Sequence, residues 1–130
     1  MKKGRLLELI LRLAAAGIFA QTLFYKFTGA PESVEIFSKL GVEPWGRWAA
    51  GVSELVAAIL LLTPRFAWCG AALGLGVIGG AILSHLFVLG IEIQGDGGLL
   101  FALAVIVFAC CAVVLWRQRR KLPVIGPRFP

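Results

Sequence analysis

The chain has 130 residues, of which 59% are hydrophobic and only 15% are charged. Soluble domains carry about 45–50% apolar and about 25% charged residues, so this composition excludes an ordinary soluble protein and indicates a membrane protein. At about 20 residues per crossing, the length allows four membrane spans and no separate soluble domain. We therefore predict one all-α membrane domain over residues 1–130, a polytopic bundle of four transmembrane helices.

The formal net charge is +6, and most of the basic residues lie toward the two ends of the chain. They are Lys2, Lys3, Arg5, Arg12, Arg117, Arg119, Arg120, Lys121 and Arg128. A basic run directly after an apolar segment is typical of a cytoplasmic membrane anchor. We therefore expect a lipid bilayer as the main partner and no binding to nucleic acid.

The first predicted span covers residues 6–25 and has a basic head followed by an apolar core. Signal peptides share this arrangement, and Ala20 would end a tolerable cleavage site. Glu8 and Arg12 interrupt the apolar region that a signal peptide needs, so we expect residues 6–25 to remain as a span. Cleavage would still leave three spans.

The loop after this span contains the pattern of a shorter helix. Pro31 suits the first turn of a helix and Gly41 its end. Glu35 and Lys39 are four residues apart and form a favourable helical pair. Between Pro31 and Gly41, apolar residues recur at helical spacing, namely Val34, Phe37 and Leu40. We predict a short amphipathic helix, residues 31–40, on the outer membrane surface, partly covering the bundle.

Three more spans are predicted at residues 45–62, 66–89 and 98–116, followed by a basic cytoplasmic tail at 117–130. The third span carries two rows of small residues, Gly70 with Gly74 and Gly76 with Gly80 and Ser84. Such rows let helix backbones approach closely in lipid. The second span also has a small-residue face, which consists of Ala50, Gly51, Ala57 and Ala58. Glu54 lies on that face, so we expect it to point into the bundle.

Two signals indicate the orientation in the membrane. Arg65 lies in the short turn between spans two and three, on the same side as both basic termini. The positive-inside rule then places the N- and C-termini in the cytoplasm. Tryptophans favour the same topology, because Trp45 and Trp48 mark the outer end of span two. Trp68 and Trp116 mark the inner ends of spans three and four.

Polar side chains gather in the outer half of the predicted bundle. Glu54 lies about 13 Å from the outer end of span two at 1.5 Å per residue, and His85 lies about one turn from the outer end of span three. The inner half offers Arg12, which can snorkel to the surface, and the cysteines. We predict a ligand or proton site that consists of Glu54, His85, Lys26, Tyr25, Gln21 and Asp96.

Each of these residues also has a structural interpretation. Glu54 and His85 could hydrogen-bond to neighbouring helices, Lys26 could anchor its helix at the surface, and Asp96 could cap the fourth span. As chemistry, a Glu–His pair can relay protons or hold a quinone-like carbonyl. With a single histidine we expect neither a metal site nor bis-histidine haem. We find no hydrolase triad, phosphate-binding loop or dinucleotide fingerprint, which argues against a classical enzyme and leaves no catalytic residue to name.

The three cysteines, Cys69, Cys110 and Cys111, lie in apolar segments without a C-x-x-C pair. We interpret them as small buried apolar residues, which gives no support to a disulfide-exchange function.

Five stretches carry a resemblance to a known family: RLAAAGIFAQTLFYKFTGAPES, GVSELVAAILLL, TPR, AILSHLFVLG and GDGGLLFALAVIVF. From about Arg12 to Trp116 the chain resembles the DoxX family of small four-helix membrane proteins. The resemblance implies a four-helix bundle in the bacterial inner (plasma) membrane. It also implies an association with quinone-linked oxidation of thiosulfate or with membrane redox complexes, whereas more distant relatives act as assembly factors or cargo receptors.

Three functional hypotheses follow. In the first, the chain is an accessory subunit of a quinone-linked or other redox complex. Glu54 and His85 then handle protons, and the ligand is a small polar molecule or the head group of a quinone. In the second, it transports an ion or a small solute and works as a homo-oligomer, because four spans are few for alternating access. In the third, it is a scaffold or assembly factor whose surface helix meets a partner protein through Phe37.

Overall fold

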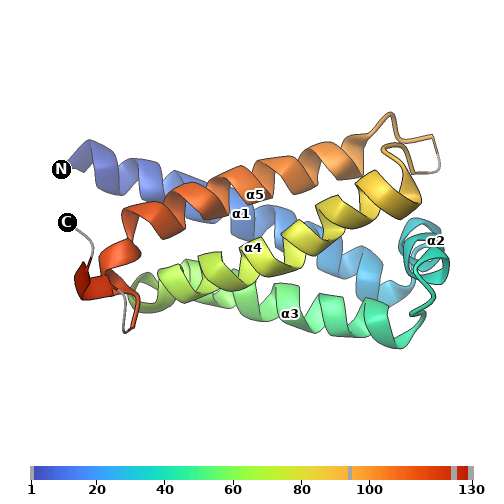
Figure 1. Ribbon diagram of the computed structural model, residues 1–130, viewed down its shortest axis with the longest axis horizontal. Helices are drawn as coiled ribbons and strands as arrows, with labels where there is room; N and C mark the ends of the chain where they lie inside the picture. The colour runs from blue at the N-terminus through green and yellow to red at the C-terminus, as the bar shows by residue number, and fades with distance from the viewer. Residues whose placement is uncertain (1, 94, 124–125, 129–130) are drawn as a thin grey trace.

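The computed structural model describes residues 2–93, 95–123 and 126–128. Four long helices form an up-and-down bundle in this part of the chain, as Figure 1 shows: α1 (Lys2–Thr28), α3 (Trp45–Leu62), α4 (Ala67–Ser84) and α5 (Leu99–Arg117). The short helix α2 (Pro31–Lys39) crosses one end of the bundle, while the two ends of the described chain lie at the other. The all-α fold with four spans is confirmed.

Short elements complete the connections. A 3₁₀ turn, η1 (Pro64–Phe66), leads into α4, and a π-helical turn, η2 (His85–Leu89), ends it. Two further 3₁₀ turns follow α5, η3 (Arg119–Lys121) and η4 (Gly126–Arg128). The main departure from the predicted bounds is α1, which is longer at both ends than residues 6–25 because nothing before Gly29 breaks the helix.

The outer surface of the bundle is apolar. All four long helices, including the turns that continue α4, are long and apolar enough to cross a bilayer. Large apolar side chains such as Phe24, Ile59 and Phe87 are more than half exposed on these helices. Apolar surface on this scale suits lipid rather than water, so the chain is a multi-pass membrane protein.

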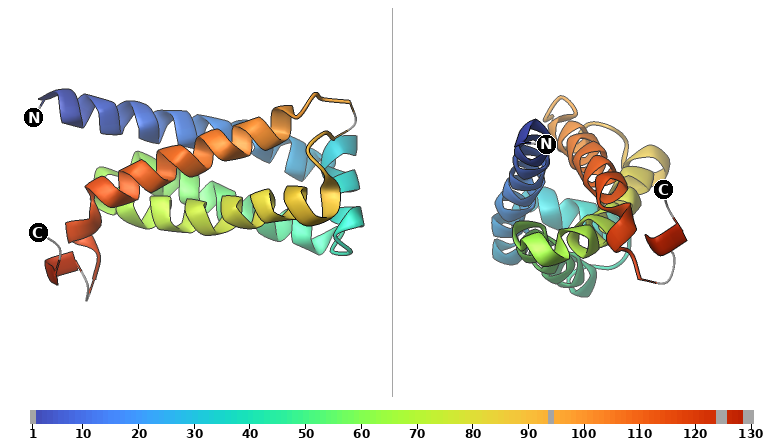
Figure 2. Two further views of the ribbon diagram at one scale, coloured as in Figure 1. Left: turned by 45° about the horizontal axis from the view of Figure 1, so that its top comes forward. Right: turned by 90° about the vertical axis from the view of Figure 1, so that its left-hand side faces the viewer.

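The four helices form a square in which α1 and α4 each pack against α3 and α5, an arrangement that can be followed in Figure 2. The centre is filled by Phe19, Leu61, Val107, Cys111 and Val114, each at most 1% exposed. Cys110 is also buried, as expected, whereas Cys69 is only partly buried.

Only one of the two predicted small-residue rows holds helices together. A Cβ atom on Gly70 would lie 2.6 Å from the backbone nitrogen of Leu61, and one on Gly74 would lie 2.9 Å from the Sγ atom of Cys111. The expectation for the second row was wrong, because a Cβ on Gly76 or Gly80 would meet nothing within 4 Å. Both glycines are exposed on α4, and Gly80 also lines the cavity described below.

Arg12 does not snorkel to the surface. It is buried, and its Nε atom donates a hydrogen bond to the carbonyl oxygen of Leu61 at 2.6 Å. This carbonyl belongs to the last turn of α3, where helix carbonyls lack partners within the helix. Arg12 therefore caps α3 from the neighbouring helix and links α1 to α3 far from the predicted polar site.

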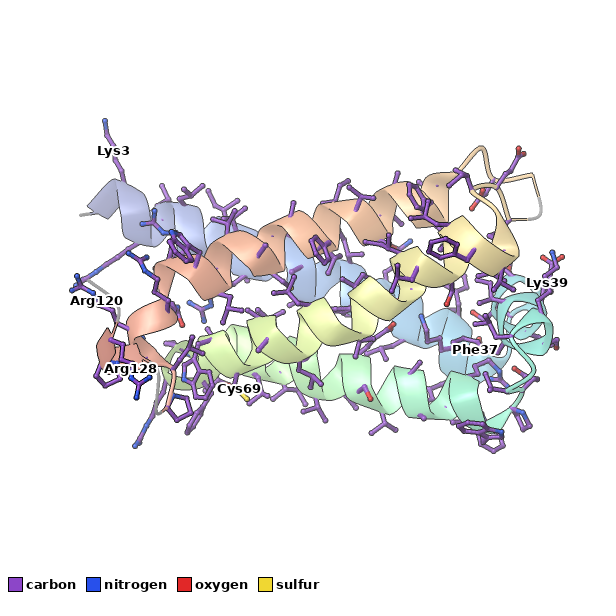
Figure 3. All side chains as sticks on the ribbon, in the orientation of Figure 1. Lys3, Phe37, Lys39, Cys69, Arg120 and Arg128 are labelled. Carbon is purple, nitrogen blue, oxygen red and sulfur yellow. The ribbon has the colours of Figure 1, made fainter. Side chains whose placement is uncertain are left out.

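The short helix predicted at residues 31–40 is confirmed as α2. It begins at Pro31 and ends before Gly41, whose φ of +76° is a conformation that glycine adopts without strain. The Lys39 Nζ and Glu35 Oε1 atoms form the expected pair at 3.4 Å. Figure 3 shows Lys39 on the outer side of α2 and Phe37 on the side facing the bundle, whereas Lys3, Arg120 and Arg128 lie at the opposite end of the molecule.

Candidate functional site

The end of the bundle next to α2 contains a cavity of about 490 Å³. Helices α1 to α5 all contribute to its wall, which is mostly apolar. Its polar side chains include every residue of the predicted site: Glu54, His85, Lys26, Tyr25, Gln21 and Asp96. The fold therefore brings these residues from separate helices to one cavity, and their function in binding remains a prediction.

An ion pair between α1 and α3 is the most polar feature of the wall. The Nζ atom of Lys26 lies 3.1 Å from Oε1 of Glu54, and their side chains are only 15% and 5% exposed. A buried carboxylate and ammonium are tolerated when each partners the other. Glu54 points into the bundle, as predicted from the small residues that surround it on the same face of α3.

Thr22 is a member of this group that the sequence analysis missed. Its hydroxyl is 3.0 Å from Oε2 of Glu54 and 2.9 Å from the carbonyl oxygen of Phe19. Because a hydroxyl has one proton, the two acceptors share it, and the carboxylate is the stronger acceptor. Thr22 lies one helical turn before Lys26 on the same face of α1, and this i,i+4 spacing was the available signal.

Arg47 fixes the start of α3 beside the same ion pair. It is 7% exposed, and its Nε and Nη2 atoms both lie 2.9 Å from Oε1 of Glu43. Its Nη1 atom donates to the carbonyl oxygen of Lys26. Lys26 is thus tied to α3 through its side chain and through its backbone. Neither Arg47 nor Glu43 was among the residues predicted for the site.

His85 opens the π-helical turn and is 5% exposed. Its Nδ1 atom lies 3.0 Å from the carbonyl oxygen of Gly90. A carbonyl can only accept, so Nδ1 carries a proton, and in the neutral ring Nε2 is left as an acceptor. The ring also packs edge-on against Phe101 at 5.6 Å between centroids. Within the described residues no hydrogen bond joins His85 to Glu54, so the two share the cavity without forming a direct pair.

Asp96 uses its carboxylate for its own loop, as the capping interpretation predicted. Oδ1 accepts from the backbone N–H groups of Ile93 at 3.0 Å and Gly98 at 2.8 Å, and Oδ2 accepts from Leu100 at 3.1 Å. Partial desolvation raises the pKa of Asp96, but these N–H groups together with that of Leu99 outweigh it, so the pKa lies below its ordinary value. Asp96 lines the cavity mainly as the cap of α5.

We predict that replacing Asp96 by alanine lowers the free energy of unfolding by about 1 kcal/mol through loss of this cap. In the native protein the stabilisation from Asp96 is fully present above its unfolded pKa near 3.8 and is lost as the pH falls through the lower folded pKa. Thermal unfolding of the purified protein at pH 7 and below pH 3.8 measures both effects. If the wild type remained more stable than the Asp96→Ala variant by the same amount in strong acid, the capping role of Asp96 would be contradicted.

Gln21 and Tyr25 lie on the cavity wall and also on the outer surface of α1. Tyr25 is 42% exposed, and its ring meets Phe24 edge-on at 5.6 Å. Within the described part of the chain, neither the Gln21 amide nor the Tyr25 hydroxyl has a hydrogen-bond partner. These two groups therefore mark the rim of the cavity rather than its floor.

Together these groups offer a compact set of donors and acceptors in an apolar surrounding. The Lys26 ammonium and the Tyr25 hydroxyl can donate to a ligand oxygen, while the His85 imidazole and the Glu54 carboxylate can accept from a hydroxyl. No group of three or more histidine, cysteine, aspartate or glutamate residues that could hold a metal ion occurs among the residues described.

Comparison with protein families gives a match to the DoxX model over residues 7–90. The chain belongs to the DoxX family. The matched region runs from α1 to the end of η2 and stops short of α5, so it is shorter than the resemblance up to Trp116 that the sequence suggested. Within this DoxX region lie Lys26, Glu54 and His85, whereas Asp96 lies beyond it.

One similar protein is the uncharacterized protein YwoB of Bacillus subtilis (strain 168). It is 28% identical over 128 residues, which cover 98% of this DoxX chain and 70% of the relative. A search of solved structures found no significant match.

Proposed function

We propose that this DoxX protein is a membrane subunit of a quinone-linked or other redox system, which binds the polar head of its ligand in the cavity beside α2. The observation that carries the proposal is the Lys26–Glu54 pair, placed with Thr22 in the wall of an otherwise apolar cavity of about 490 Å³. Ligand sites in proteins are commonly concave and apolar with a few converging polar groups. Ionisable residues inside membrane spans are usually functional.

The polar groups suit a ring that carries carbonyl or hydroxyl oxygens. A quinone carbonyl would accept a hydrogen bond from Lys26 or Tyr25, and a quinol hydroxyl would donate to His85 or Glu54. Proton exchange with the ligand would fall to His85 and Glu54, since these two can change protonation state. The chain would supply binding and proton handling, and electron transfer would need a redox partner protein.

We also propose the bacterial inner membrane as the location, with the termini in the cytoplasm and α2 on the outer side. The support is the charge distribution: Lys3, Arg120 and Arg128 lie at the end of the bundle opposite α2 (Figure 3). Loops rich in lysine and arginine stay in the cytoplasm. The cavity would then open near the outer surface.

We predict that replacing Glu54 by glutamine lowers the affinity for a bound quinone about ten-fold or more while the yield of folded protein stays unchanged. Glutamine keeps the shape of the side chain and an oxygen for Thr22, but it removes the charge that faces Lys26. The measurement is mass spectrometry of small molecules that co-purify with the protein in mild detergent. Ser53→Ala on the same helix is the matched control, because among the described residues the Ser53 hydroxyl bonds only to the carbonyl of Ala49.

An assembly-factor function is the alternative, and the contacts of Lys26 favour it. Its side chain reaches Glu54 and its carbonyl accepts from Arg47, so the polar group also ties α1 to α3. Phe37 does not suit the partner contact predicted for it, because it lines the cavity. A partner would instead meet the exposed side of α2 at Ser38 and Lys39. The alternative would be favoured if a partner protein co-purified in stoichiometric amount, no small molecule were bound, and Glu54→Gln left the amount of partner unchanged.

A further inference from the structure

The cavity is covered on the side that faces water. Ser33, Ile36, Phe37 and Leu40 line it from α2 and the residue after it, and Ser33 is only 8% exposed. Helix α2 packs against α1, α3 and the π-helical turn that follows α4. Figures 1 and 2 show α2 lying across this end of the bundle. A ligand that came straight from water would therefore meet α2 first.

On the side between α1 and α5, the cavity is lined by side chains that are also exposed. Figure 1 shows these two helices crossing at an angle, with their ends near α2 well apart. On the α1 side Gln21 and Tyr25 line the cavity and are exposed, and on the α5 side Leu99 lines it and is 56% exposed. Gly80 on α4 also lines the cavity and is exposed, but it carries no side chain, so we take the three exposed side chains of α1 and α5 to mark the mouth. This mouth faces the lipid, because it lies in the side of the bundle.

The depth of Gln21 supports this assignment. It precedes Thr22, which contacts Glu54, and Glu54 lies nine residues after Trp45, or about 13 Å along α3. Trp45 and Trp48 are exposed and are typical of the membrane–water interface. The Gln21 amide is therefore placed on an outward surface at hydrocarbon depth, where an unpartnered polar group is costly. The head of an amphiphile passing through the mouth would give this amide a partner.

We propose that the cavity is reached laterally from the bilayer, through the mouth between α1 and α5, and that its ligand is a lipid-dissolved amphiphile. Its hydrogen-bonding head reaches Lys26 and Glu54, while its apolar tail leaves between Gln21 and Leu99 and stays in the lipid. The chemistry of the head rests on the proposed function, whereas the route and the tail rest on the shape of the cavity.

The route can be tested without a quinone. The full-length protein is placed in lipid vesicles with a long-chain alcohol that carries a photoreactive diazirine beside its hydroxyl group. After illumination, mass spectrometry locates the adducts. We expect adducts on Glu54 or Lys26, and adducts confined to outward residues such as Ile59 and Phe87 would overturn the proposal.

Two variants narrow the mouth, Gln21→Trp and Leu99→Trp, and both residues are exposed enough for the larger ring to be tolerated. Each is expected to lower the yield of adducts on Glu54 about ten-fold. Phe24→Trp is the matched control, because Phe24 is 66% exposed on α1 and does not line the cavity. An equal yield in all three variants would overturn lateral access even if one of them were poorly folded.

A second measurement separates this proposal from the proposed function. The affinities of menadione, which has no tail, and of a menaquinone with an isoprenoid tail are measured in lipid nanodiscs. We expect Gln21→Trp to weaken the tailed quinone about ten-fold and menadione less than two-fold. Binding of neither quinone, together with labelling of Glu54 by the alcohol, would remove the quinone function and leave lateral access standing. If instead both quinones bound equally well to Gln21→Trp and the wild type, and the alcohol did not label Glu54, lateral access would be refuted and the quinone function would stand.

Discussion

Replacing Gly70 by alanine is expected to lower the free energy of unfolding by about 3 kcal/mol, near the upper end of the usual cost of overpacking. The added Cβ would lie 2.6 Å from the backbone nitrogen of Leu61 and 2.9 Å from the carbonyl oxygen of Ala57. Backbone atoms of a helix cannot turn aside as the end of a side chain can. Helices α3 and α4 would have to move apart along their contact, which in lipid depends on close packing.

Gly76→Ala is the matched control for Gly70→Ala, on the same helix and with the same added atom. A Cβ on Gly76 meets nothing within 4 Å, and alanine favours a helix over glycine by up to about 1 kcal/mol. We therefore expect Gly76→Ala to be neutral or slightly stabilising. Thermal unfolding of both variants in the same detergent measures the difference, and equal melting temperatures would show that α3 and α4 do not approach closely at Gly70.

The contrast between these two glycines shows what the sequence could predict about packing. Both lie in a row of small residues on one apolar span, and the spacing alone favoured close contact for both. Which row meets a neighbour depends on the rotation of α4 about its axis, and this is set by the packing of α4 against α3 and α5. The spans themselves were predictable, because 18 or more apolar residues in a row have few alternatives.

The candidate site was predictable in its depth but less so in its contacts. Counting 1.5 Å per residue from the ends of the spans placed Lys26, Glu54 and His85 in one half of the bundle, and they line one cavity. The count could not show that Glu54 would bond to Thr22 and Lys26 rather than to His85. That choice depends on which helices are neighbours, since α1 packs directly against α3. Nor could it show the π-helical turn that carries His85.

Lys26→Met is expected to lower the free energy of unfolding by about 3–5 kcal/mol, because it leaves the Glu54 carboxylate buried without its cation. Of the residues that the structure describes, Thr22 alone would remain as a partner for that carboxylate. Glu54→Gln should cost less, because Lys26 lies in the last turn of α1 and its flexible chain can turn its charge toward water. Chemical or thermal unfolding of the two single variants, side by side in one detergent, measures this asymmetry. A larger loss for Glu54→Gln would contradict it.

The double variant Lys26→Met with Glu54→Leu separates stability from function. Replacing a buried ion pair by apolar residues of similar size is often neutral or stabilising, so we expect the double variant to unfold at or above the wild-type temperature. If the pair serves a ligand, this stable protein will still have lost its bound small molecule, because the donor and the acceptor of the head group are gone. If the pair only joins α1 to α3, the stable double variant will keep every measurable activity and every partner. A double variant that is stable but has lost its bound small molecule would show that the pair is not needed for stability, and it would support the proposed binding of a polar head group in the cavity around Glu54.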